Sequence, residues 1–287
     1  MALESALVLG AANGLVWGFI LALIALGLTL VFGVIRIINV AHGDLYMLGA
    51  VIGWYLIGYL GSFWLALILA PIVVGVLGLA MERSVLRPIE DKAILTIIAT
   101  FGLSMVFQQG VLATFGGAPQ RIPPPFHAVL NVYGYGYDVF RIFVAGFSAV
   151  ALIALWLFLY KTRFGTWIRA VRQDRELALG VGIPTNQIYL VTFAIGSGLA
   201  ALGGVLAAPI VALDFQMGID ILPSALMVVI IGGLGSLEGS LLASILLGEL
   251  EGIASVFVTP TTAKILQLLT MSLVLLVRPR GLFGRKV

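Results

Sequence analysis

Residues 7–35 read LVLGAANGLVWGFILALIALGLTLVFGVI, a run of 29 residues without one charged side chain. About 20 mostly apolar residues are enough for a helix to cross the hydrocarbon layer of a membrane. As a single helix this run would be about 44 Å long, so we expect a kink or an extra turn outside the bilayer. A signal peptide has basic residues before an apolar stretch of only about 7–15 residues. No Lys or Arg precedes Arg36, and we therefore expect a retained membrane segment.

The composition of the whole chain agrees with this first run. Of its 287 residues 61% are hydrophobic and 10% are charged, whereas a soluble domain has about 25% charged residues. So little charge cannot cover a water-facing surface, which excludes a secreted soluble domain, a disordered chain and a nucleic-acid-binding protein. The absence of cysteine excludes disulfides, thiolate zinc sites and iron–sulfur clusters. We therefore expect one polytopic membrane domain over residues 1–287.

Further apolar runs indicate more membrane helices. They cover Leu45–Leu60, Phe63–Met81, Ala93–Phe115, Val139–Tyr160, Ile188–Leu213, Leu241–Val258 and Ala263–Val277, with a shorter run at Ile221–Ile231. The shorter run has 11 residues, too few to cross a membrane as a helix. The sequence therefore predicts an all-α bundle of about eight transmembrane helices with broken or re-entrant pieces.

The basic residues predict the orientation, because cytoplasmic loops carry an excess of Lys and Arg. Twelve of the 16 basic residues lie in three segments that we expect in the cytoplasm: Arg83, Arg87 and Lys92; Lys161, Arg163, Arg169, Arg172 and Arg175; and Arg278, Arg280, Arg285 and Lys286. The loop 116–138 holds only Arg121 and should face outward. The chain can end on the cytoplasmic side only if residues 221–258 enter the membrane and return to the same side of it. This predicts a broken hairpin whose turn, Gly232–Gly239, lies inside the membrane.

Motifs of ATP hydrolysis and of membrane hydrolases are absent from the sequence. It contains no G-x-x-x-x-G-K-[ST] phosphate loop, no H-E-x-x-H and no G-x-S-x-G. His42 and His127 are the only histidines, too few for a histidine-based metal site. We therefore expect no catalytic residue, no metal and no cofactor on this chain.

Two interruptions of the apolar pattern are candidates for the lining of a translocation pathway. Irregular backbone is tolerated at membrane depth only where it is buried in protein or lines a water-filled cavity. Interrupted helices in both halves of a transporter therefore point to its pathway. The first interruption offers Asn39, His42, Asp44 and Tyr46, and the second offers Gly232, Gly233, Gly235, Ser236 and Glu238. On a helix, Asn39, His42 and Tyr46 would share one face. Alternatively, the first is a short cytoplasmic loop and the second a tight helical turn.

Two acidic residues, Glu249 and Glu251, fall inside an apolar run. A charge at the bilayer centre costs about 2.5–3.5 kcal/mol, so such residues face a cavity or a partner. We expect Glu249 to face a subunit interface and Glu251 to be solvated near the membrane surface. The small residues of Gly196–Gly204 have a different role, because they predict close packing between helices.

The longest polar segment between two apolar runs is Lys161–Gln187. Gly180 and Gly182 close a short charged helix in it, and Pro184 prevents this helix from continuing. The segment is either a solvated elbow or a docking element for a soluble partner, and its length favours docking. The residues that we expect at the docking position are Arg169, Arg172, Asp174, Arg175, Glu176, Ala178, Gly180 and Gly182.

Five blocks of this sequence follow one another in the order found in a known family. They are Ala25–Gly33, Ile38–Asp44, Glu82–Pro88, Arg169–Gly182, and Gly232–Gly239 together with the tail Arg278–Gly284. In this combination the chain resembles, over essentially its whole length, the permease subunits of branched-chain amino acid ABC importers, the LivH type. The segment from Glu176 to Gly182 resembles the E-A-A-x-x-x-G coupling loop of ABC importers, with Leu177 in place of the first alanine.

The resemblance implies an ABC importer permease fold in the bacterial cytoplasmic (inner) membrane. It also implies four kinds of partner: a second related permease in a heterodimer, two cytoplasmic ATPase subunits that bind ATP and Mg²⁺, an extracytoplasmic substrate-binding protein, and the lipid bilayer. The chain would then form half of a pathway for branched-chain, hydrophobic or neutral amino acids. One alternative is the same machinery carrying urea, short amides or other amino acids. Another is a stand-alone secondary transporter or channel, against which the scarcity of intramembrane acids argues.

Overall fold

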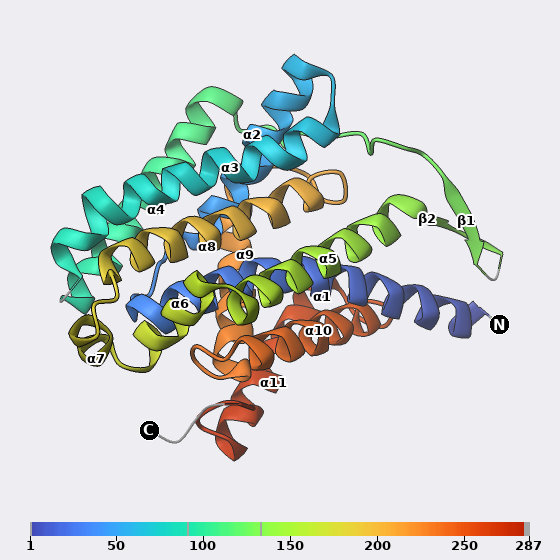
Figure 1. Cartoon of the computed structure of the whole chain (residues 1–287). Helices are drawn as coiled ribbons and strands as arrows, with labels where there is room; N and C mark the ends of the chain where they lie inside the picture. Colours follow the sequence, from blue (N-terminus) through green and yellow to red (C-terminus); the bar gives the residue numbers. More distant parts are fainter. Residues whose placement is uncertain (1, 91, 133, 284–287) are drawn as a thin grey trace.

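The computed structural model describes residues 2–90, 92–132 and 134–283, most of them in long helices (Figure 1). The helices are α1 (Ala2–Ile35), α2 (His42–Leu60), α3 (Phe63–Met81), α4 (Ala93–Phe115), α5 (Val139–Lys161), α6 (Arg163–Gln173), α7 (Arg175–Gly180), α8 (Thr185–Ala207), α9 (Met217–Gly232), α10 (Leu237–Ala254) and α11 (Pro260–Val277). A π-helical turn, η1 (Glu82–Leu86), and a 3-10 turn, η2 (Arg87–Ile89), follow α3. Gly284, Arg285 and Lys286, which belong to the predicted cytoplasmic tail, lie outside the described residues.

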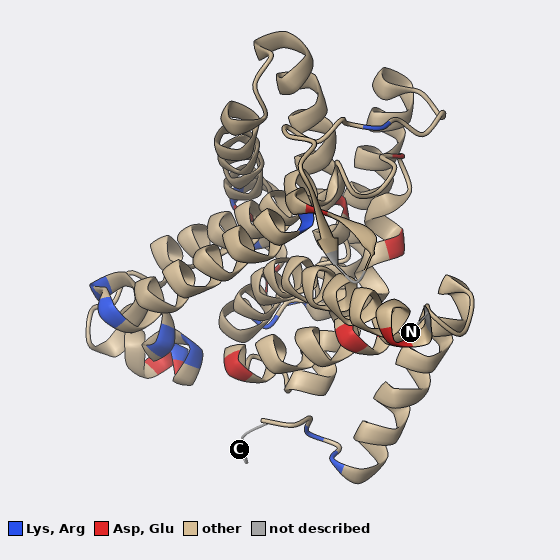
Figure 2. Ribbon diagram, turned by 90° about the vertical axis from the view of Figure 1, so that its right-hand side faces the viewer, with Lys and Arg blue, Asp and Glu red and all other residues tan. Residues whose placement is uncertain are grey.

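Within the described residues, seven helices are long and apolar enough to cross a membrane: α1, α2, α3, α4, α5, α8 and α11. The helix α9 is apolar but shorter, and α10 contains three glutamates. Figure 2 shows the long helices with few charged residues along their lengths. The prediction of an all-α, multi-pass membrane bundle is confirmed. The loop between α4 and α5 adds one antiparallel hairpin, β1 (Val129–Val132) with β2 (Tyr135–Asp138), that the sequence did not predict.

The long N-terminal run forms one unbroken helix, α1, of 34 residues and about 51 Å. The expected kink is therefore absent, and the extra length continues the helix beyond Leu7 to the exposed Glu4. Its segment Ile20–Ala25 is fully buried. A helix that is apolar all round and buried is a core element. The chain leaves α1 at Arg36, which has a left-handed backbone conformation with φ 60°.

Glycines let two later helices approach the backbone of α1. A Cβ added at Gly248 of α10 would lie 2.5 Å from the carbonyl oxygen of Gly14 in α1. A Cβ added at Gly196 of α8 would lie 2.8 Å from the carbonyl oxygen of Gly27, also in α1. In lipid there is no hydrophobic driving force between helices, so van der Waals packing has to hold them together. Small residues at such crossings allow this close packing. The predicted packing role of Gly196–Gly204 is confirmed.

The three basic segments meet at one end of the bundle, which we call the basic end. Arg87 with the Asn186 carbonyl and Arg175 with Glu90 join the first two segments. The tail lies against the end of α9, where the N–H of Leu282 donates to the Ile231 carbonyl. The contacts at the other end are the β-bridge between Gln120 and Leu213 and the hydrogen bond from Arg141 to Asn13. Segments that the charge pattern assigned to one side of the membrane therefore do lie together.

The helices α9 and α10 form a hairpin. The helix α9 starts beside the buried start of α2, since a Cβ added at Gly218 would lie 2.8 Å from Cα of Asp44, and α10 ends beside Gly10 in the first part of α1. The turn of this hairpin packs on the last part of α1, since a Cβ added at Gly33 would lie 3.2 Å from Cα of Gly235. The tail also contacts it, because the N–H groups of Leu282 and Phe283 donate to the carbonyls of Ile231 and Gly232. The sequence placed this turn inside the membrane. These contacts place it at the basic end, level with the end of α1.

Candidate functional site

The predicted docking segment contains two short helices rather than one. The helix α6 ends at Gln173 and α7 begins at Arg175, because Asp174 between them has an extended backbone with φ −154° and ψ 112°. The Asp174 carboxylate accepts a hydrogen bond of 3.0 Å from the N–H of Leu177. Asp174 therefore caps the first turn of α7, the role for which aspartate is preferred at helix starts.

The helix α7 and the residue after it present three apolar side chains to the surface. Leu177 is 70% exposed, Leu179 is 50% exposed and Val181 is 77% exposed. Between them, Ala178 is buried against the bundle. Adjacent exposed apolar groups, here flanked by the exposed Glu176, indicate a surface that another protein covers. This surface, Leu177, Leu179 and Val181, is called the α7 surface below.

The end of α7 is fixed by a glycine, as the sequence predicted. Gly182 has φ +82°, and its N–H donates to the Leu179 carbonyl at 3.0 Å. The N–H of Ile183 then donates to the Ala178 carbonyl at 3.0 Å. Such bonds satisfy the last carbonyls of a helix, and the left-handed residue that they require is usually glycine. The next helix, α8, starts at Thr185.

Arginines of the predicted docking set hold α6 against the bundle. The guanidinium of Arg169 lies 4.8 Å from the ring centroid of Tyr160 and also donates to the Leu159 carbonyl. Arg172 packs beside Gly33, where an added Cβ would lie 3.4 Å from the arginine Cδ. These two side chains therefore anchor α6 to α5 and α1.

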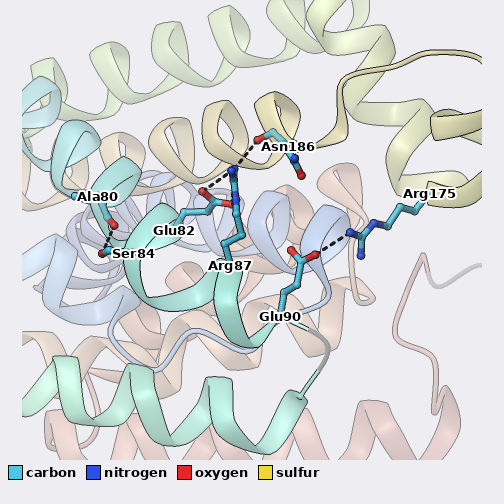
Figure 3. A network of polar contacts seen from close by, with 7 residues as sticks. All are labelled: Ala80, Glu82, Ser84, Arg87, Glu90, Arg175 and Asn186. Carbon is cyan, nitrogen blue, oxygen red and sulfur yellow. Dashed lines mark hydrogen bonds and ion pairs between the residues drawn. The ribbon is translucent and has the colours of Figure 1, made fainter.

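A polar network anchors α7 at the basic end (Figure 3). The Arg175 guanidinium donates to the Glu90 carboxylate at 2.7 Å. Arg87 makes two hydrogen bonds of 3.2 Å with Glu82, a residue of the π-helical turn η1 whose side chain is buried, and donates to the Asn186 carbonyl at 3.0 Å. Charge-assisted bonds of this paired kind are stronger than neutral ones. The network joins α7, η1, η2 and the start of α8, and the sequence analysis did not predict it.

The first set of pathway candidates lies at the break between α1 and α2. Residues 36–41 are not helical, and α2 begins at His42. Asn39 therefore precedes the helix, so the predicted common face with His42 and Tyr46 is wrong for Asn39. Asn39, His42, Asp44 and Tyr46 are all buried, with exposures of 2% or less.

The buried polar groups at this break are only partly hydrogen-bonded. Nε2 of His42 lies 2.9 Å from the Ile24 carbonyl oxygen of α1, and Asp44 accepts a bond of 3.1 Å from Gln108. Both polar atoms of the Asn39 side chain, and Nδ1 of His42, have no hydrogen-bond partner in the described part of the chain. A buried polar group without a hydrogen-bond partner lowers the stability of the folded protein by about 1–3 kcal/mol.

One face of α4 supplies the polar surroundings of the break. Thr96, Thr100, Ser104 and Gln108 follow at intervals of four residues and so share one face of the helix. The Thr100 hydroxyl accepts a bond of 3.2 Å from the N–H of Val40. The sequence analysis missed this face, although four polar residues at helical spacing in an apolar run are a readable signal.

The second set of pathway candidates is held in the turn between α9 and α10. Ser236 caps α10 by accepting a bond of 3.1 Å from the N–H of Gly239, and Glu238 accepts a hydrogen bond from the Tyr160 hydroxyl. Gly232 and Gly233 pack against the start of α10 and the tail, respectively. These residues form a tight, packed turn at the basic end.

The structure does not bring the two sets of pathway candidates together. The first set contacts α1 at Ile24 through His42, and the second contacts α1 at Gly33 through Gly235. Nine residues of helix separate these two points, which corresponds to about 14 Å along the axis. A role for either set in translocation stays a prediction.

The acidic residues of α10 lie in different surroundings. Glu251 is half-buried and accepts a hydrogen bond of 2.9 Å from Gln267 of α11, and its solvation near the membrane surface stays a prediction. Gln267 is fully buried and also donates to the Leu247 carbonyl at 3.0 Å, which fastens α11 to α10. The backbone of Glu249 faces Gly14 of α1. The subunit-interface role of the Glu249 side chain stays a prediction.

Known proteins match this chain over nearly all of its length. The family described as "Branched-chain amino acid transport system / permease component" matches residues 10–275. The high-affinity branched-chain amino acid transport system permease protein LivH of Escherichia coli is 30% identical over 95% of this chain and 94% of its own. The corresponding protein BraD of Pseudomonas aeruginosa is 32% identical over the same shares. The permease protein LivM of Salmonella typhimurium is 27% identical over 78% of this chain and 59% of its own. No solved structure matches the chain.

The matched region runs from the glycine-rich part of α1 to the end of α11 and includes the docking segment, the break at residues 36–41 and the α9–α10 turn. Both the family match and the two relatives that are at least 30% identical extend over far more than half of the chain. This multi-pass membrane protein therefore belongs to the family of permease components of branched-chain amino acid transport systems.

Proposed function

We propose that this chain is one permease subunit of an ATP-driven importer of branched-chain amino acids in the bacterial cytoplasmic membrane. The observation that carries the proposal is the α7 surface, three exposed apolar side chains on a capped helix at the basic end. The positive-inside rule assigns this end to the cytoplasm. A soluble partner in the cytoplasm would cover the α7 surface and exclude water from it.

The partner that fits this surface is an ATPase subunit, since the chain has no phosphate loop of its own. Binding of ATP between two such subunits would bring them together and displace α7. The permease pair would respond by changing between inward-open and outward-open states. The similarity to LivM, another permease of such a system, supports a second, related permease beside this one.

The proposed substrate follows from the names of the relatives, LivH and BraD, which are permeases of branched-chain amino acid systems. An external binding protein would select the substrate and deliver it at the end opposite to the basic end. The pathway then needs only weak polar contacts for the charged ends of an amino acid. The buried break with Asn39, His42 and Asp44 is the candidate for such contacts.

The test is to extract the tagged chain gently from its native membrane and to identify the proteins that co-purify. We expect two phosphate-loop ATPases and a second permease, and an ATPase activity that rises with a leucine-loaded binding protein. Recovery of the chain alone, together with uptake by liposomes that contain only this chain and no ATP, would contradict the proposal. Stimulation by urea or short amides but not by leucine, isoleucine or valine would contradict the substrate.

A pair of glycines at the end of α7 gives a sharper test of the docking position. Gly180→Ala adds a methyl group to a helical residue in open space, whereas Gly182→Ala forces alanine into φ +82°. The left-handed conformation costs a residue other than glycine about 1–2 kcal/mol. We expect Gly182→Ala to lower substrate-stimulated ATPase activity several-fold and Gly180→Ala to leave it unchanged. Equal activities of the two variants in the purified complex would show that the end of α7 has no part in coupling.

A further inference from the structure

The helix α4 contacts two regions that are far apart in the molecule. At the basic end, Glu90, the ion-pair partner of Arg175 on α7, precedes the start of α4 at Ala93 by three residues. Further along, Thr100 and Gln108 of α4 contact Val40 and Asp44 at the break between α1 and α2. A second helix, α8, also links the two regions: it follows α7 in the chain, and its Gly204 packs against the backbone of Tyr46.

The packing of α4 differs from the packing of its neighbour α8. The helix α8 is locked to α1 and α2 by backbone contacts, such as those of Gly196 with Gly27 and of Gly204 with Tyr46. The two glycines of α4, Gly102 and Gly110, have open space where a Cβ would be. Only one narrow face of α4 is buried, and this face consists mainly of hydroxyl and amide groups. The helix α4 is therefore the more movable of the two.

The polar face of α4 also allows movement along the helix axis. Thr96, Thr100 and Ser104 repeat a hydroxyl at every fourth residue, so that a shift by one turn, about 5.4 Å, replaces one hydroxyl by the next. The N–H of Val40 would again find an acceptor after such a shift. The Asn39 amide has no partner in the described chain in this arrangement, and Asn39 directly precedes Val40, whose N–H bonds to this face.

We propose that α4 is the helix that transmits the movement of α7 to the buried break. Its connection to α7 is the ion pair between the positioning residues Glu90 and Arg175, called the joint below. The inference rests on the proposed function, since it requires an ATPase that moves α7. The joint is suited to this role because it is partly shielded from water: 17% of the Glu90 side chain and 41% of the Arg175 side chain are exposed. Water therefore weakens this ion pair less than a surface pair. The joint acts on Glu90, which lies only three residues before the start of α4 at Ala93.

The first test uses the complete complex, reconstituted in liposomes with its co-purified partners. Glu90→Gln and Arg175→Gln are each expected to lower substrate-stimulated ATPase activity about tenfold, equivalent to about 1.4 kcal/mol of coupling. Basal ATPase activity and the recovery of the partners should stay unchanged in Glu90→Gln, because Glu90 lies outside the docking segment. The exchanged pair, Glu90→Arg with Arg175→Glu, should restore part of the stimulation. Arg83→Gln, an exposed position on η1, is the matched control and should behave as the wild type.

The second test measures the movement directly, because a purely structural joint would not change it. The chain has no cysteine, so single cysteines can be placed and spin-labelled without background. Met105→Cys on α4 and Val150→Cys on α5 are exposed positions. The distance between the two labels should change by several ångströms, about one helical turn at most, between the nucleotide-free and ATP-vanadate states. In the Glu90→Gln background it should not change.

The outcomes separate this inference from the proposed function. If the wild-type complex shows no stimulation by substrate at all, the proposed function fails. If the wild type is stimulated, and Glu90→Gln and Arg175→Gln are stimulated equally, only the role of the joint is wrong. A label distance that is the same in both nucleotide states of a stimulated wild type would overturn the movement of α4.

Discussion

Gly248→Val is expected to prevent the bundle from folding, whereas Gly102→Val is expected to leave it intact. A Cβ at Gly248 would lie 2.5 Å from the Gly14 carbonyl oxygen and 2.5 Å from Cα of Gly18. All these atoms belong to the backbone of α1, so they can move away only if α1 and α10 separate. At Gly102, by contrast, no atom lies within 4 Å of the added Cβ. Both positions are helical, so the intrinsic cost of valine in a helix is the same in both variants.

Overpacking in a core costs about 1–3 kcal/mol and occasionally more. Because rigid backbone meets rigid backbone at Gly248, we expect a loss at or above the upper end of this range. The measurement is the yield of monodisperse protein in detergent, followed by thermal unfolding of the recovered fraction. Similar yields and unfolding temperatures for the two variants would show that the contact between α1 and α10 does not determine stability. Gly14→Val should reproduce the effect from the other helix.

Leu177→Asp combined with Val181→Asp is expected to abolish transport without unfolding the protein. Both side chains are mostly exposed, so their replacement removes no core contact. Two carboxylates on the α7 surface would lose their hydration when an ATPase covers this surface. Burying a carboxylate costs free energy that only a paired opposite charge can offset. The measurement is the amount of ATPase that co-purifies with the variant, together with substrate uptake by the reconstituted complex.

Leu234→Asp is the control for this double variant. Leu234 is 61% exposed and lies in the α9–α10 turn at the same end of the bundle, but it is not part of the α7 surface. The control should retain its ATPases and transport substrate. Normal recovery of ATPases with the double variant would mean that the partner docks elsewhere on the basic end. The assignment of the α7 surface would then be wrong, although the fold would stand.

The membrane helices and the grouping of the basic segments at one end could be predicted because the signals for them are local. A run such as residues 7–35 needs no partner to reveal that it is a membrane helix, and charged loops show their side by composition alone. The same holds for the end of α7, since Gly182 and Pro184 stop a helix through their own backbone properties. These predictions concern short stretches of chain and do not depend on the arrangement of distant segments.

The failures concern contacts between segments that are distant in the sequence. The hydrogen bond between Glu251 and Gln267 was not predicted, because the two residues lie on different helices. The network of Arg87, Glu90 and Arg175 draws on three segments, and no local pattern pairs them. The polar face of α4 is the exception, since its spacing was visible and its meaning was not recognised.

The close contact between α1 and α10 has a consequence for the biosynthesis of the protein. Ribosomes add roughly 5–20 residues per second, so Gly248 is made roughly 10–50 s after Gly14. During this interval α1 has entered the membrane while its glycine face can touch only lipid or a helix that is not its native neighbour. Insertion of α1 and its final packing are thus separate events in time. A mutation on α10 would therefore leave a fully inserted but incompletely assembled chain, which cellular proteases for membrane proteins would degrade.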